Sequence, residues 1–151
     1  MINLNEASAF SRKSPYEIYQ EWEEIPVYKD FIIPDLLGLK LGDWARNGGK
    51  AAFVNMDGAG GTCDVLIEEI APGAQLKPQR HLYEKAVFIL EGQGATRIWN
   101  EGGKKHTLEW QKGSLFSTPL NTWHQHFNAQ GKAPVRMVSL TDAPGVINRY
   151  R

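Results

Sequence analysis

The chain has 151 residues, with 17 basic and 17 acidic side chains and a formal net charge of zero. This length suits one domain with a sizeable core, and the scatter of charges excludes the basic stripe of a nucleic-acid-binding protein. Cys63 is the only cysteine, which excludes an internal disulfide. Because the N-terminus lacks a signal-peptide pattern and no apolar run approaches the roughly 20 residues that span a bilayer, we expect a cytoplasmic protein without a membrane partner.

The first predicted element is a short helix that begins near Pro15. The run 14–17 supplies an N-cap serine, a proline at the first helical position and a glutamate three residues after the cap. Tyr19 and Trp22 give the helix an apolar side, and Pro26 limits its length. A helix this short does not persist alone, so we expect it to dock on the outer face of a sheet, in its own subunit or in a neighbouring one.

The rest of the chain reads as short strands separated by turns. Extended segments are predicted at 27–33, 36–41, 51–56, 62–70, 86–90, 95–99, 106–110, 114–117, 123–127 and 135–140. Turn signals recur roughly every eight to twelve residues after residue 72, which is typical of an antiparallel sandwich or barrel. The glycine-rich run 57–61 is a turn and not a phosphate-binding loop, because no helix follows it. The tail, 143–151, is predicted to be an ordered or loosely packed strap.

The stretch 113–128 carries the clearest functional signal. It reads as a strand, a turn set by Pro119 and Asn121, and a second strand with His124 and His126. Side chains two apart in a strand share a face, so both imidazoles and the Asn128 amide should point the same way. Two neutral imidazoles on one face suit a divalent transition metal. A pair of hydrogen-bonded histidines in a polar cavity is the alternative.

Two stretches resemble the paired motifs of the cupin superfamily. The second follows the cupin spacing with Gly113, Pro119, His124 and Asn128, and has Asn121 where glycine is usual. The first begins at 73, continues through 79–81 and ends at 88–92, so the resemblance covers roughly 62–140. The run 123–126, Trp-His-Gln-His, also resembles gentisate-dioxygenase-like cupins.

This resemblance implies an all-β fold, a double-stranded β-helix or jelly-roll barrel with a short N-terminal helix. The single cupin domain, 1–151, would divide into a helix and strap at 1–50, a barrel core at 51–142 and a tail at 143–151. The resemblance also implies a divalent transition metal inside the barrel, with iron(II) favoured and manganese, nickel or zinc suitable as well. A homodimer is expected, because the aromatic residues between 16 and 31 offer more apolar surface than a strap needs.

The first motif departs from the cupin pattern. Cupins usually place His-x-His there and a glutamate four or five residues later, whereas this chain has Gln79 at the first histidine and Lys85 at the glutamate position. His81 and His124 are carried over as metal ligands, and Gln79 and Glu84 are the candidates to complete the set. An ammonium about 5 Å from a divalent ion would be repelled by roughly 7 kcal/mol at an effective dielectric near 20.

Three arrangements at Lys85 therefore stay open. Its side chain turns outward, or a one-residue bulge turns Glu84 inward, or the site holds no metal. With the bulge, His81, His124 and Glu84 form the two-histidine, one-carboxylate set that suits iron(II). Without it, His126 and the Gln79 carbonyl oxygen could complete a neutral set.

The predicted function is that of a metal-dependent enzyme, a dioxygenase-like cupin acting on a small organic molecule. His126 would move protons or orient the bound oxygen species, and Arg97, if it points inward, would clamp a substrate carboxylate. The alternatives are a metal-free or weakly metallated module that binds a small ligand, and a non-redox isomerase, cyclase or lyase. His106, which follows a lysine-rich turn, is expected at the surface.

Overall fold

The computed structural model describes residues 13–149. Helix α1 (Pro15–Glu23) begins where the capping pattern predicts, with the Glu17 N–H donating to Ser14 Oγ at 3.2 Å. It ends at Glu24, which adopts the left-handed conformation with φ of 58°. No helix in the described range is long and apolar enough to cross a membrane.

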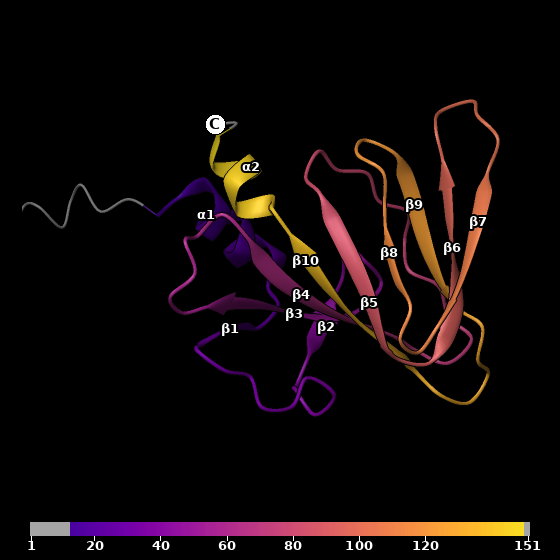
Figure 1. The fold of residues 1–151 in the computed structure, drawn as a ribbon, viewed down its shortest axis with the longest axis horizontal. Coiled ribbons are helices and arrows are strands. Elements are labelled where there is room, and N and C mark those ends of the chain that lie inside the picture. The colour runs from indigo at the N-terminus through magenta and orange to yellow at the C-terminus, as the bar shows by residue number, and fades with distance from the viewer. Residues whose placement is uncertain (1–12, 150–151) are drawn as a thin grey trace, which may run out of the picture.

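Within residues 13–149, two β-sheets face each other across the interior (Figure 1). The larger sheet runs in the order β1, β3, β4, β10, β5, β8, with β2 paired to β3, and the smaller runs β7, β6, β9. The strands of the larger sheet are β1 (Val27–Asp30), β2 (Gly42–Trp44), β3 (Gly49–Met56), β4 (Asp64–Ile70), β5 (Lys85–Glu91), β8 (Leu115–Ser117) and β10 (Val135–Thr141). Those of the smaller sheet are β6 (Gln93–Trp99), β7 (His106–Gln111) and β9 (Trp123–Asn128).

Strand register divides the large sheet into an inner and an outer face. Met137 of β10 pairs with Glu68 of β4 and with Ile89 of β5, so these side chains share one face. That face is the inner one, because an apolar core cluster joins it to Trp110 of the small sheet. Strand alternation then places Val138 on the outer face.

The strands predicted between residues 51 and 140 all form, within two residues of their expected bounds. The segment 36–41 does not form a strand, and β2, which follows it, was not predicted. The carbonyls of Leu36, Leu37 and Leu39 instead accept hydrogen bonds from Arg136 Nη1 at 2.9, 2.8 and 2.9 Å. Carbonyls turned toward one guanidinium cannot form a strand ladder, which explains the irregular backbone.

The C-terminal tail is helix α2 (Ala143–Arg149) and not a strap, so that prediction was wrong. Pro144 and Gly145 are unfavourable inside a helix, but proline is tolerated in a first helical turn because its missing N–H would have no partner there. Asn148 Oδ1 accepts a hydrogen bond from the Tyr16 backbone N–H at 3.0 Å, so α2 holds the start of α1. Residues 1–12 of the predicted N-terminal strap and residues 150–151 of the predicted tail lie outside the described residues.

Helix α1 docks on the inner face of the large sheet, beyond the part that the small sheet covers. Phe53 pairs with Leu66, which shares the Glu68 face, and the rings of Tyr16 and Tyr19 pack on Phe53 at centroid distances of 6.4 and 5.9 Å. The Tyr16 hydroxyl also hydrogen-bonds the Asp64 carboxylate. The expected outer-face docking was wrong, because a buried hydroxyl needs a polar partner and the inner face provides it.

Candidate functional site

The segment between β4 and β5 brings the first motif beside the second. Gln79 and His124 exchange backbone hydrogen bonds at 2.9 Å in both directions, which aligns this segment with the free edge of β9. The His81 carbonyl then accepts the Asn121 N–H at 2.9 Å. Asn121 has φ of 56°, a left-handed conformation that asparagine tolerates, so this turn works without the usual glycine.

Three imidazoles meet inside the barrel. The ring centroids of His81 and His124 lie 4.9 Å apart, and those of His124 and His126 lie 5.5 Å apart. His124 and His126 are 2% and 3% exposed. In the described part of the chain, the Nε2 atom of each ring is buried without a hydrogen-bond partner. The structure thus brings together three of the predicted site residues.

Backbone carbonyls orient two of these rings. His81 Nδ1 lies 3.0 Å from the Tyr83 carbonyl oxygen, and His124 Nδ1 lies 3.3 Å from that of Thr122. A carbonyl only accepts hydrogen bonds, so these contacts assign the proton to Nδ1 in both rings. The Nε2 lone pairs of His81 and His124 are therefore free to accept from a ligand.

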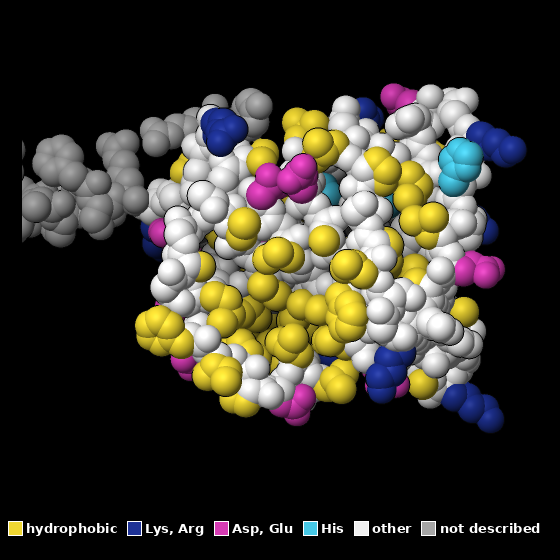
Figure 2. All heavy atoms as spheres, viewed as in Figure 1, with side chains coloured by type: hydrophobic (Ala, Val, Ile, Leu, Met, Phe, Trp, Pro, Cys, Tyr) yellow, Lys and Arg dark blue, Asp and Glu magenta, His cyan; other side chains and the backbone are white. Residues whose placement is uncertain are grey.

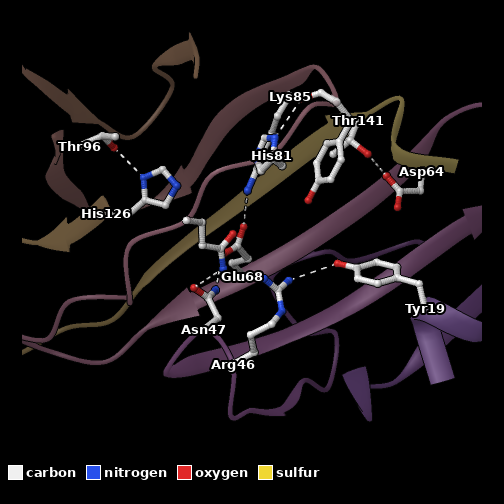
Figure 3. A network of polar contacts seen from close by, with 12 residues as sticks. Tyr19, Arg46, Asn47, Asp64, Glu68, His81, Lys85, Thr96, His126 and Thr141 are labelled. Atoms are coloured by element: carbon white, nitrogen blue, oxygen red, sulfur yellow. Dashed lines mark hydrogen bonds and ion pairs between the residues drawn. The ribbon is translucent and has the colours of Figure 1, made fainter. Parts of the chain in front are cut away.

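The third ring is held by the small sheet. His126 Nδ1 lies 2.7 Å from Thr96 Oγ1, and that oxygen also accepts the Trp110 indole N–H at 2.9 Å. Thr96 is fully buried. Its hydroxyl is thus the group that sets the orientation of His126 (Figure 3).

A buried ion pair lies beside the imidazoles. Lys85 Nζ donates to Glu68 Oε1 at 2.9 Å, and both side chains are 2% exposed. Asn47 donates to Glu68 Oε2 at 2.7 Å, and Gln79 Nε2 donates to Asn47 Oδ1 at 2.9 Å (Figure 3). Lys85 thus points inward with its charge balanced. The β5–β10 pairing contains one register shift, opposite Ile89 and Glu91. This shift is at the other end of β5 from Glu84, so it is not the bulge that would turn Glu84 inward.

Burial and the Lys85 charge keep the three rings neutral. Burial first, and then the charge of Lys85, lowers the pKa of His81 and of His124 to about 3 and that of His126 to about 4. Burial would raise the pKa of Glu68, but the charge of Lys85 and the hydrogen bonds to this carboxylate outweigh burial and lower it to about 2. The site therefore has no net charge at neutral pH.

Two predicted site residues lie away from the imidazoles. Glu84 is exposed, and its backbone N–H donates to Asp142 Oδ1 at 2.7 Å. Arg97 is also exposed, and its guanidinium lies 5.0 Å from the centre of the Phe127 ring. The structure does not bring Glu84 or Arg97 to the histidine cluster. His106 is exposed, as predicted.

Three residues of the site were not predicted from the sequence: Glu68, Asn47 and Thr96. A signal for Glu68 was present, because it alternates with Leu66 and Ile70 in a strand, and a carboxylate among inward apolar residues needs a partner. Asn47 lies in a turn and Thr96 is an ordinary strand residue, so no local pattern distinguishes either one.

A pocket of about 180 Å³ opens toward His81 from the side of α1. Trp22, Arg46 and Arg80 are among its lining residues. Arg46 Nε is paired with Glu23 Oε1 at 2.5 Å, whereas no carboxylate is paired with Arg80 within residues 13–149. The pocket therefore gives a small molecule access to the side of His81.

The residues present do not fit a divalent metal ion. His81 and His124 offer two lone pairs, but the Glu68 oxygens already accept from Lys85 and Asn47. Between residues 13 and 149, no group of three or more His, Cys, Asp or Glu side chains is arranged to hold a metal. The buried ammonium of Lys85 also opposes a second cation nearby.

Comparison with known proteins identifies the family. The chain matches the cupin domain over residues 66–141. Similar solved structures include the cupin domain of Schizosaccharomyces pombe Cnp3, with 16% identity and a TM-score of 0.58 over 71% of this chain and 70% of that one. An oxalate decarboxylase from Lactobacillus farciminis has 20% identity and a TM-score of 0.59, over 70% of this chain and 31% of its own.

Vicilin from Corylus avellana has 15% identity and a TM-score of 0.59, over 70% of this chain and 32% of its own. At these identities the likenesses show the fold alone, and the chain spans about a third of the decarboxylase and of vicilin. No curated protein matches the sequence. The family match and the two facing sheets confirm the predicted jelly-roll fold, and the chain belongs to the cupin family.

Proposed function

We propose that the protein binds a small polar organic molecule at the imidazoles of His81, His124 and His126, next to the pocket that His81 lines, without a resident metal ion. The main observation in support of this proposal is that the Nε2 atoms of His81, His124 and His126 are buried without hydrogen-bond partners. Buried polar atoms are nearly always hydrogen-bonded in folded proteins, so three such atoms on adjacent rings favour a ligand. The Lys85–Glu68 pair beside them supplies further polar contacts at no net charge.

The second candidate is the metal-dependent dioxygenase that the cupin resemblance implies. The free Nε2 lone pairs of His81 and His124 support it, because imidazole is a ligand for iron(II), manganese, nickel and zinc. Lys85 weighs against it, since this residue replaces the glutamate ligand that cupins usually have. The two candidates differ in whether ligand binding requires a metal.

Binding after metal removal tests the proposal. We expect protein treated with a chelator to bind a member of a panel of hydroxy acids, phenols and diketones, detected by thermal shift and measured by NMR titration. His124→Leu should weaken that binding by about tenfold or more, because a buried hydrogen bond is lost. His106→Leu is the matched control, since His106 is exposed, and it should bind as the wild type does.

A contrary result would be binding that requires added iron(II) together with about one equivalent of metal retained on purification. That outcome would favour the metal-dependent enzyme over the proposed metal-free binding site.

We also propose that the protein forms a homodimer through the outer face of the large sheet. Phe88 pairs with Val138 and Leu115, and Leu140 lies two residues from Val138 on the same face. Phe88, Leu115 and Leu140 are 39%, 71% and 56% exposed. Hydrophobic side chains surround a hollow over β4, β10 and β5 (Figure 2). A second copy would cover this face through a self-complementary two-fold contact.

We expect light scattering to return about twice the chain mass of 17.0 kDa for the wild type. Leu115→Glu should return the monomer mass, because a carboxylate in an apolar interface has no partner. Trp22→Glu separates this face from the aromatic segment 16–31, since Trp22 is 69% exposed and belongs to α1 on the other side of the sheet, and this variant should remain a dimer. A wild-type mass of one chain would contradict the dimer.

A further inference from the structure

The two hydrogen bonds of the Thr96 hydroxyl assign the tautomer of His126. Thr96 Oγ1 accepts from Trp110 Nε1 at 2.9 Å and lies 2.7 Å from His126 Nδ1. If His126 donated from Nδ1, the buried Thr96 hydroxyl proton would have no acceptor in the described structure. If the hydroxyl donates to Nδ1, all three groups are satisfied. The ring then carries its proton on Nε2, the atom that is buried without a partner.

His81 and His124 have the opposite tautomer. Their Nδ1 atoms face the carbonyl oxygens of Tyr83 and Thr122, so each Nε2 has a lone pair. The histidine cluster thus offers two hydrogen-bond acceptors, on His81 and His124, and one donor, on His126. The His124 ring is close to both of the others, with ring centroids 4.9 Å from that of His81 and 5.5 Å from that of His126.

From this arrangement we infer that the histidine cluster selects a neutral small molecule with a hydroxyl group next to a carbonyl group. The hydroxyl would donate to His124 or His81, and the carbonyl oxygen would accept from His126. This inference deepens the proposed ligand-binding function and rests on it. The same tautomer also leaves His126 with no lone pair for a metal at Nε2.

The charges beside the histidine cluster favour a neutral ligand. Lys85 and Glu68 compensate each other at 2.9 Å, so an ionic ligand would add an unbalanced charge to a buried site. The hydroxyls of Thr118 and Ser139 are buried without partners on the inner face and could adjust to either role.

Two-bond ¹H–¹⁵N correlation spectra of the wild-type protein test the tautomers directly. We expect protonated Nδ1 in His81 and His124 and protonated Nε2 in His126. In Thr96→Ser the hydroxyl remains, so His126 should keep its tautomer. In Thr96→Val the hydroxyl that donates to His126 Nδ1 is lost, so the fraction of His126 protonated at Nε2 should fall. Protonated Nδ1 in wild-type His126 would overturn the inference.

Matched small ketones test the ligand class. We expect the chelator-treated protein to bind hydroxyacetone at least about tenfold more tightly than methoxyacetone, which keeps the carbonyl but has no hydroxyl to donate. Equal affinity for the two would overturn the inference. If the wider panel contains a ligand but hydroxyacetone does not bind, the ligand class is wrong and the proposed function stands. If nothing in either set binds, both fail.

Discussion

Replacing Lys85 by methionine is expected to lower the free energy of unfolding by about 3–5 kcal/mol, because it leaves a buried carboxylate without its partner. Glu68 is 2% exposed and its pKa is lowered to about 2 by Lys85 despite burial. Without the ammonium, this carboxylate must stay charged in the interior or take up a proton. Urea denaturation of the wild type and the variant at pH 7 measures the loss.

The double variant Lys85→Met with Glu68→Met separates a broken pair from a damaged core. Both charges are then replaced by apolar side chains, and most of the lost stability should return. Lys112 and Glu91 form a matched exposed pair at 3.4 Å, with side chains 69% and 52% exposed, so Lys112→Met should cost less than about 1 kcal/mol. A double variant as unstable as the single one would show that Lys85 does not act through Glu68.

Acidification is expected to destabilise the protein from about pH 6.5 downward. The three buried imidazoles have pKa values lowered from 6.5 to about 3, 3 and 4. Between these values and 6.5 the unfolded chain binds more protons than the folded one, so stability falls as the pH falls. Each histidine can contribute up to about 1.4 kcal/mol per pH unit in this window. Glu68 adds to the loss only at lower pH, between 4.5 and about 2.

Urea midpoints measured between pH 7 and pH 5 give the slope. His124→Leu should reduce it by about a third, because one of three similar groups is removed. The comparison uses slopes within each variant, so a general loss of stability in His124→Leu does not affect it. His106→Leu should keep the wild-type slope. Equal slopes in His124→Leu and the wild type would mean that the buried rings do not control the acid response.

Much of the secondary structure could be predicted from local pattern. Strand alternation placed His124, His126 and Asn128 on one face, and all three are buried. The Ser14 cap located α1 within a residue. These features depend on neighbours only a few positions apart, so the order of residues contains the information that determines them.

Local sequence pattern was sufficient to predict the alternating strands, the start of α1 and the two imidazoles on one face of β9. The burial of the Lys85 charge depends on the three-dimensional fold, because its partner Glu68 lies 17 residues away on a strand separated from β5 by β10. The tautomer of His126 likewise depends on Thr96, which lies 30 residues away on β6. Charge balance and proton position are set by contacts across strands, and the order of strands in a sheet does not follow from local periodicity.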